Sequence, residues 1–196
     1  MDIAALAPTI VVSYLLGSIP FGLILTRLNG AGDLRSIGSG NIGATNVLRT
    51  GRKGLAAATL LLDLLKGYAA VWIAGNLPGG DPAIGGLFAV IGHCFPVWLK
   101  FKGGKGVATL MGISLGLGWQ IGLVYAVVWL AMLALTRISS LSGMSAALVA
   151  PFAAGAAGLR DHVPVLAILA VLVLFLHRAN IARLLAGTEP RVGSKS

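Results

Sequence analysis

The segment VATLMGISLGLGWQIGLVYAVVWLAMLALT, which runs from Val107 to Thr136, contains no charged side chain. As one helix it would be about 45 Å long, whereas the hydrocarbon core of a bilayer is about 30 Å thick. Lys105 precedes the segment and Arg137 follows it. Because cationic side chains that flank membrane helices stay on the cytoplasmic side, an even number of crossings should separate these two residues. We therefore expect two short helices with a break within residues 116–119.

The rest of the chain is similarly apolar. Hydrophobic residues make up 57% of the 196 residues, charged residues make up 11%, and the mean hydropathy is +0.90. A soluble domain of this size cannot bury that much apolar surface. We expect an all-α integral membrane protein with a single domain over residues 1–196, because the longest connector, residues 29–53, is too short for a separate domain. The seven expected transmembrane helices lie near residues 6–27, 54–76, 82–99, 106–118, 120–136, 141–158 and 163–186.

The distribution of positive charge predicts an orientation for these helices. All Lys and Arg residues except Lys66 and Arg160 lie in or beside four connectors, which alternate with nearly uncharged ones. The positive-inside rule places those four connectors in the cytoplasm. The amino terminus, near Asp2, is then outside, and the carboxyl terminus, near Lys195, is cytoplasmic. This bias accounts for the net charge of +9, so we expect no nucleic-acid partner.

The first glycine-rich connector reads SIGSGNIGATNVLRTGRKG, from Ser36 to Gly54. Its glycines match the dinucleotide-binding fingerprint only formally, since that motif follows a strand and this connector follows a membrane helix. Glycines allow tight turns that aim successive N–H groups at an anion, so we favour an anion site over an ordinary polar loop. Arg49 is a suitable bidentate partner for a phosphate. The other candidate ligands are Ser39, Gly40, Asn41, Gly43, Thr45 and Asn46.

The second glycine-rich connector is GHCFPVWLKFKGGKGVAT, from Gly92 to Thr109. It differs from a P-loop because Lys105 is followed by glycine instead of Ser or Thr. A lysine among glycines at the start of a helix still describes an anion site, which we assign to Gly103, Gly104 and Lys105. We interpret Lys100 and Lys102 as positive-inside anchors.

Two further segments contribute candidate residues at the cytoplasmic side. His177 and Asn180 are three residues apart in the last expected helix and therefore share a face. Arg178 and Arg183, in the same segment, are expected to extend towards lipid headgroups. The sequence SSLS opens the sixth expected helix, where it forms either a helix cap or a substrate contact. Its candidate residues are Ser140 and Ser142.

Several polar residues of the expected helices have two open interpretations. Asp63 and Lys66 lie one turn apart and can neutralise each other, which we favour slightly over a functional role. His93 is equally well explained as a core histidine or as a site residue. For Cys94 we favour a small buried apolar residue over a nucleophile. We expect no metal site, since no cluster of metal ligands occurs.

Three stretches of the chain carry a family resemblance. They are GSGNIGATN from Gly38 to Asn46, the second connector, and HRANIARLLAGTE from His177 to Glu189. At these stretches the chain resembles the acyl-phosphate:glycerol-3-phosphate acyltransferases, bacterial integral membrane enzymes of phospholipid synthesis. The resemblance implies seven helices in the inner membrane, in contact with membrane lipid, an outside amino terminus and a cytoplasmic active site.

The resemblance also implies a reaction. A fatty acyl group passes from acyl phosphate to the sn-1 hydroxyl of glycerol 3-phosphate, giving 1-acyl-glycerol 3-phosphate (lysophosphatidic acid) and inorganic phosphate without any cofactor. By motif position, the residues that cradle acyl phosphate are Ser39, Gly40, Asn41 and Gly43. Those that hold glycerol 3-phosphate are Arg49, Lys105, His177 and Asn180. No histidine is followed five positions later by aspartate, which excludes the His-x4-Asp dyad of acyl-CoA-dependent acyltransferases.

The chemistry of an acyl phosphate favours direct transfer. Its leaving group is already a stable anion, so positioning and charge neutralisation are the main requirements. The proton acceptor is then the phosphate of glycerol 3-phosphate or, alternatively, His177. A small transporter of phosphorylated metabolites is the second hypothesis, but only Asp63 and Lys66 place polar groups deep among the helices.

Overall fold

The computed structural model describes residues 3–193, so Asp2 and Lys195 lie outside the described residues. Within this range the chain forms ten α-helices and three short 3-10 helices, with no strand, so the predicted all-α class is confirmed. The helices are α1 (Ile3–Gly17), α2 (Phe21–Leu28), η1 (Leu34–Ser36), α3 (Ala44–Leu48), α4 (Lys53–Asn76), α5 (Pro82–Cys94), η2 (Val97–Leu99), α6 (Val107–Leu117), α7 (Trp119–Thr136), α8 (Ser139–Ala156), η3 (Arg160–His162), α9 (Val163–Leu176) and α10 (Arg178–Leu185).

Each of the seven expected apolar segments is helical, although they differ in length and continuity. Five helical stretches in the described residues are long and apolar enough to cross a membrane, namely Ala4–Leu28, α4, Pro82–Leu99, α7 and α8. A sixth results if α9, with η3 before it, and α10, which are bent by 60° relative to each other, form one span. Helix α6 is apolar but has only 11 residues. The count of seven crossings therefore stays a prediction.

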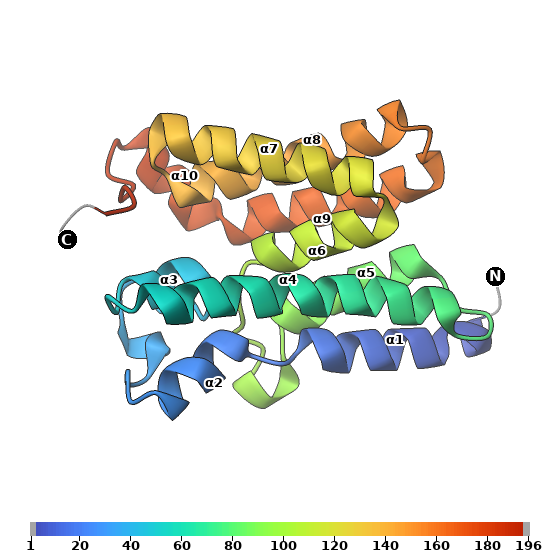
Figure 1. Ribbon diagram of the computed structural model, residues 1–196, viewed down its shortest axis with the longest axis horizontal. Helices are drawn as coiled ribbons and strands as arrows, with labels where there is room; N and C mark the ends of the chain where they lie inside the picture. Colours follow the sequence, from blue (N-terminus) through green and yellow to red (C-terminus); the bar gives the residue numbers. More distant parts are fainter. Residues whose placement is uncertain (1–2, 194–196) are drawn as a thin grey trace.

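The predicted break in the long uncharged segment is confirmed. Helix α6 ends at Leu117, Gly118 adopts an extended backbone with φ 179° and ψ 127°, and α7 begins at Trp119. Figure 1 shows α6 between two groups of helices, with α7 to α10 above and α1 to α5 below. Since α6 packs against both α4 and α7, it joins the two groups into one bundle.

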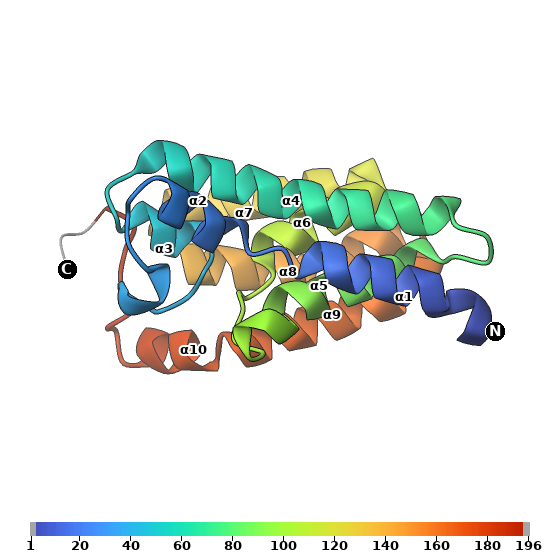
Figure 2. The same cartoon turned by 90° about the horizontal axis from the view of Figure 1, so that it is seen from below.

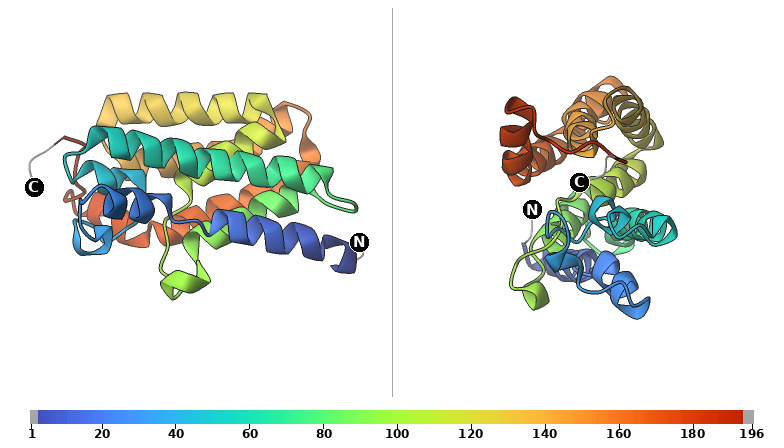
Figure 3. Two further views of the ribbon diagram at one scale, coloured as in Figure 1. Left: turned by 60° about the horizontal axis from the view of Figure 1, so that its bottom comes forward. Right: turned by 90° about the vertical axis from the view of Figure 1, so that its left-hand side faces the viewer.

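Successive connectors lie at alternating ends of the bundle. Figures 1 and 2 show α2, α3, α10 and the α7–α8 turn at one end, and the start of α1 and the α4–α5 turn at the other. The second connector lies in the same half as α10. Figure 3 shows α10 turned away from the line of α9 at this end. The four positively charged connectors of the sequence therefore gather in one half of the molecule.

Close helix contacts depend on glycine. A Cβ atom on Gly67 of α4 would lie 2.2 Å from the carbonyl oxygen of Thr109, and one on Gly112 of α6 would lie 1.9 Å from that of Leu64. Small residues allow such backbone contact, which helix association in lipid requires because burial of apolar surface supplies little driving force there. A separate apolar cluster anchors the first connector against α2 and α4. Its buried members are Leu23, Leu34, Ile42, Val47 and Ala56.

Candidate active site

Asn46 organises the first connector. Its side chain is 2% exposed, and its Nδ2 donates to the carbonyl oxygens of Leu34 (2.9 Å), Ile37 (2.9 Å) and Asn41 (2.8 Å). Its Oδ1 accepts from the Ser39 N–H at 3.2 Å. Because the amide is engaged inside the connector, its observed role is to shape the loop, and a contact between Asn46 and a ligand stays a prediction.

Two glycines of this connector adopt conformations that disfavour other residues. Gly38 and Gly40 have φ angles of 52° and 67°. A Cβ atom on Gly38 would also lie 2.7 Å from both Cδ and Nη1 of Arg49, so the arginine side chain passes directly over this glycine. Ser39 is exposed between the two glycines. The Oδ1 of Asn41 accepts from the Gly43 N–H at 2.9 Å, which tightens the turn before α3.

The second connector folds back onto the last turn of α5. The N–H groups of Gly103 and Gly104 donate to the carbonyl oxygens of Cys94 (2.9 Å) and His93 (3.0 Å). A Cβ atom on Gly104 would lie only 2.0 Å from Nε2 of His93. Both N–H groups are thus used inside the protein, and any contact of these glycines with substrate stays a prediction. The next residue, Lys105, extends from this packed turn.

Lys105 meets residues from two distant segments. Its Nζ donates to Oδ1 of Asn180, and the Nδ2 of Asn180 donates to Oε1 of Glu189 at 2.6 Å. The same Oε1 accepts from Ser140 Oγ at 2.6 Å, while Oε2 accepts from Arg183 Nε at 2.7 Å. The Glu189 side chain is only 6% exposed. Three predicted site residues, Lys105, Ser140 and Asn180, are therefore brought together around one carboxylate.

The start of α8 also contacts the first connector. Thr45 Oγ1 lies 2.9 Å from Ser139 Oγ, next to the Ser140–Glu189 hydrogen bond. Together these contacts connect the first connector, α8 and the carboxyl-terminal segment. The second connector joins them through the pairing of Lys105 with Asn180.

His177 lies at the bend between α9 and α10, in a segment that we expected to be one continuous helix. The helix is interrupted there, and His177 itself is buried. Its Nδ1 lies 2.7 Å from the Val173 carbonyl oxygen, which can only accept, so the neutral ring carries its proton on Nδ1 and keeps a lone pair on Nε2. The charges of Lys105 and Glu189 are close enough to act on the ring.

Cations dominate the electrostatics of this region. Burial lowers the pKa of Lys105 below its usual range, the positive charges of Arg183, Arg49 and Arg178 lower it further, and Glu189 opposes them. For Glu189, partial burial acts to raise the pKa, but hydrogen bonds from Ser140, Asn180 and Arg183 lower it overall. Lys105 thus lies within electrostatic range of three arginines and one carboxylate, which leaves an excess of positive charge for an anionic ligand.

Some expectations for the flanking residues are wrong. Arg183 pairs with Glu189 instead of extending towards lipid headgroups. Ile138 occupies the N-cap position of α8, and no side chain makes a capping hydrogen bond there, so SSLS does not act as a helix cap. Ser142 is fully buried and donates to the Ile138 carbonyl oxygen at 2.8 Å, which turns its hydroxyl towards its own helix. Its contact with substrate stays a prediction.

Glu189 was missed as a site residue when only the sequence was considered. It is the single glutamate of the chain and lies in a basic carboxyl-terminal segment. An isolated acid among arginines is a recognisable signal for an ion pair. Ser139 was missed as well, and its partner, 94 positions away, gives no local signal.

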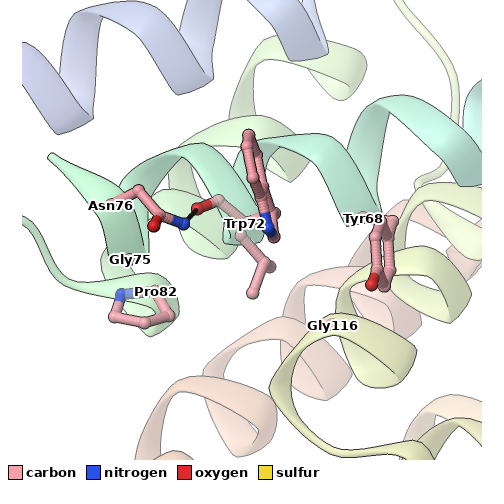
Figure 4. A pocket seen from close by; sticks show the side chains of 7 residues that line it. Tyr68, Trp72, Gly75, Asn76, Pro82 and Gly116 are labelled. Atoms are coloured by element: carbon pink, nitrogen blue, oxygen red, sulfur yellow. Dashed lines mark hydrogen bonds between the residues drawn. The ribbon is translucent and has the colours of Figure 1, made fainter.

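Two cavities lie outside the polar cluster. One, of about 210 Å³, lies between α4, the start of α5 and the end of α6, and Figure 4 shows its lining; the lining residues are Tyr68, Val71, Trp72, Gly75, Asn76, Pro82 and Gly116. None of these residues is cationic, so this cavity is unsuited to a phosphate. The second, of about 150 Å³, has an apolar lining and begins at Val107, two residues after Lys105. Its other lining residues are Leu60, Ala108, Met111, Tyr125, Ala126, Trp129 and Leu130.

Apolar helices around a cationic cluster define an integral membrane protein that is suited to a phosphorylated ligand. Residues 7–187 match the model of the glycerol-3-phosphate acyltransferase family. Glycerol-3-phosphate acyltransferase of Novosphingobium aromaticivorans is 73% identical over 186 residues, which cover 95% of this chain and 94% of the relative. The enzyme of the same name from Erythrobacter litoralis is 63% identical over 184 residues, covering 94% and 93%.

Solved structures agree with this match. The crystal structure of PlsY (YgiH), an integral membrane glycerol 3-phosphate acyltransferase, in its glycerol 3-phosphate form has a TM-score of 0.88 at 39% identity and covers 94% of both chains. Its lysophosphatidic acid form has a TM-score of 0.86 at 37% identity, again with 94% of both chains covered. The chain therefore belongs to the glycerol-3-phosphate acyltransferase family and is an integral membrane enzyme of that kind.

Proposed function

We propose that this enzyme transfers a fatty acyl group from acyl phosphate to the sn-1 hydroxyl of glycerol 3-phosphate. The products are 1-acyl-glycerol 3-phosphate and inorganic phosphate, and no cofactor takes part. The observation that carries the proposal is that hydrogen bonds link Lys105 through Asn180 and Glu189 to Arg183, while Arg49 lies within electrostatic range of Lys105. Two phosphate-bearing substrates repel each other, and such a cluster offsets that repulsion.

The two substrates occupy different parts of this cluster. Glycerol 3-phosphate binds Arg49, Lys105, His177 and Asn180, and the PlsY structure in its glycerol 3-phosphate form supports a site for this substrate. The phosphate of the acyl donor lies over the exposed turn from Ser39 to Gly43. Its acyl chain enters the apolar cavity that begins at Val107, where dispersion and burial favour a hydrocarbon chain.

The reaction is a direct displacement. The sn-1 oxygen forms a bond to the acyl carbonyl carbon, the bond from that carbon to the phosphate oxygen breaks, and phosphate leaves as an anion. The hydroxyl proton goes to the phosphate of glycerol 3-phosphate or to Nε2 of His177, which keeps a free lone pair because Nδ1 faces Val173. Positive charge from Lys105 and the arginines stabilises the negative charge that accumulates on the departing phosphate.

The orientation in the membrane belongs to the same proposal. The chain crosses the bacterial inner membrane seven times as a single domain, with the amino terminus outside and the active site in the cytoplasm. Support comes from the positively charged connectors, which gather in one half of the bundle.

The proposal is tested with the purified protein in detergent. Palmitoyl phosphate and glycerol 3-phosphate are supplied, and both phosphate release and the acylated product are measured. We expect turnover by the wild-type protein and a large loss in Lys105→Ala, because the phosphate loses a partly buried cation. No product from the wild-type protein would refute the acyl-phosphate donor. Detergent excludes vectorial transport, so a transporter would release no phosphate.

A further inference from the structure

Three buried polar side chains lie next to the cationic cluster without being part of it. Asp63 and Lys66 on α4 are each 3% exposed, and His93 on α5 is 5% exposed. The Nζ of Lys66 lies 2.7 Å from Oδ1 of Asp63, as the sequence predicted for a pair one turn apart. The Nδ1 of His93 lies 3.7 Å from the same oxygen. The proposed reaction uses none of these groups.

Lys66 connects this group to a third helix. Its Nζ also donates to the carbonyl oxygen of Ile19 at 2.8 Å, within the break between α1 and α2. The ring of Phe21 lies 5.6 Å from the same nitrogen. The ion pair therefore holds α4 against the start of the segment that leads into the first connector.

His93 connects the group to the second connector. Gly104 packs directly on its imidazole, and a Cβ atom there would lie 2.0 Å from Nε2. The Gly104 N–H donates to the carbonyl oxygen of the same histidine at 3.0 Å. Thus one edge of the ring faces Asp63 while the other supports the residue that immediately precedes Lys105.

Helix cohesion alone is a weak reason for such an arrangement. Buried charges are expensive within a membrane, and apolar residues of similar volume often stabilise a core at least as well as a buried ion pair. What an apolar pair cannot do is orient the imidazole by charge. The orientation of His93 is therefore the feature that the Asp63–Lys66 pair adds.

From this geometry we infer that Asp63, Lys66 and His93 are positioning residues, which fix Gly104 and thereby direct Lys105 at the phosphate of glycerol 3-phosphate. The inference rests on the proposed binding of that substrate by Lys105. It does not depend on the identity of the acyl donor. None of the three residues contacts substrate in this scheme.

The test removes both charges together, so that no unpaired charge remains. The double variant Asp63→Leu/Lys66→Met is compared with wild type by thermal unfolding and by calorimetric titration with glycerol 3-phosphate, in detergent and without acyl donor. We expect a similar melting temperature and a roughly tenfold weaker dissociation constant, as expected for a displaced binding group. In turnover assays KM for glycerol 3-phosphate rises while KM for palmitoyl phosphate does not. The control is Ser114→Ala, which removes a buried hydroxyl from a different helix, α6. It should leave the dissociation constant and the KM for glycerol 3-phosphate unchanged.

A second pair of variants covers the case in which the double variant does not fold. His93→Ala removes the support beneath Gly104, whereas His93→Gln restores an amide of similar reach, so glutamine should recover much of the lost affinity. Unchanged binding in a folded double variant, or equal binding by the alanine and glutamine variants, would overturn the inference. If wild type binds glycerol 3-phosphate but does not consume palmitoyl phosphate, the proposed donor is wrong, and the binding comparison still decides the positioning role.

Discussion

In the first connector Gly38 and Gly40 adopt positive φ angles, whereas in the second connector Gly103 and Gly104 pack against the last turn of α5. The first connector is held from within by the Asn46 amide, and a small apolar cluster packs it against α2 and α4. The second is held from outside by helix carbonyls and a buried histidine. Gly40 thus serves backbone conformation in the first connector, whereas Gly103 and Gly104 serve close contact in the second.

The largest expected effect comes from adding a methyl group to Gly104. Gly104→Ala places Cβ 2.0 Å from His93 Nε2, so either the imidazole or the turn before Lys105 must move. We expect a loss of kcat/KM of roughly 100-fold, typical of a binding group misplaced by about 1 Å. In Gly40→Ala the new Cβ would lie 3.2 Å from the Arg35 carbonyl oxygen, so the main effect is strain at a positive φ angle. We expect this strain to lower the free energy of unfolding by about 1–2 kcal/mol.

The control for both changes is Gly54→Ala. Apart from its chain neighbours and its own helix backbone, no atom of the described residues lies within 4 Å of a Cβ atom there, and the residue is helical, so we expect equal or slightly higher stability and normal turnover. Equal effects of alanine at positions 40 and 104 would remove the distinction between the two connectors. Steady-state kinetics and melting temperature decide between these outcomes.

Asn46→Ala should destabilise the fold of the first connector. Three carbonyl oxygens and the Ser39 N–H lose a buried partner, which should cost about 3 kcal/mol and lower the melting temperature by roughly 10 °C. Asn76→Ala is the matched control, because that exposed amide donates to the Trp72 carbonyl oxygen within its own helix. A melting temperature close to that of wild type would show that the apolar cluster holds the connector without the amide.

Glu189→Gln tests the carboxylate at which α8, α10 and the carboxyl-terminal segment meet. Glutamine keeps an acceptor for Ser140 but loses the ion pair with Arg183, so we expect the free energy of unfolding to fall by about 1–2 kcal/mol. Because the folded-state pKa of Glu189 is lowered, its stabilising contribution is complete above the ordinary glutamate pKa and is lost as pH falls through the lowered value. The melting temperature of the variant should therefore depend less on pH in acid, and an unchanged acid dependence would contradict this role.

The smallest expected effect concerns the pH profile of kcat/KM for glycerol 3-phosphate, whose alkaline limb should be shifted. Burial and the neighbouring arginines lower the pKa of Lys105, so it loses its charge, and the substrate its partner, at a lower pH than for an ordinary lysine. Arginine stays protonated throughout this range, so Lys105→Arg should bind only a few-fold differently at neutral pH and lack the limb. An identical limb in both proteins would assign it to another group.

Much of the candidate site could be predicted because its signals are local. The Asp63–Lys66 pair follows from helical spacing, and the break before Trp119 follows from the length of an uncharged segment between cations. The bend at His177 could not be predicted in this way, because α9 and α10 taken together still meet the length and hydropathy of a single span. Arg183 was expected to face lipid because its partner, although only six residues away, lies beyond the end of α10.

The sequence by itself determined the membrane environment of this protein, its helical segments and the segments that carry phosphate-binding chemistry. These features could be predicted because hydropathy, charge and glycine content act within short stretches of chain. Only the tertiary structure decided which of these segments touch. Thr45 meets Ser139, Lys105 meets Asn180, and Gly104 rests on His93. Each contact depends on the packing of several helices at once, and no short stretch of sequence encodes that packing.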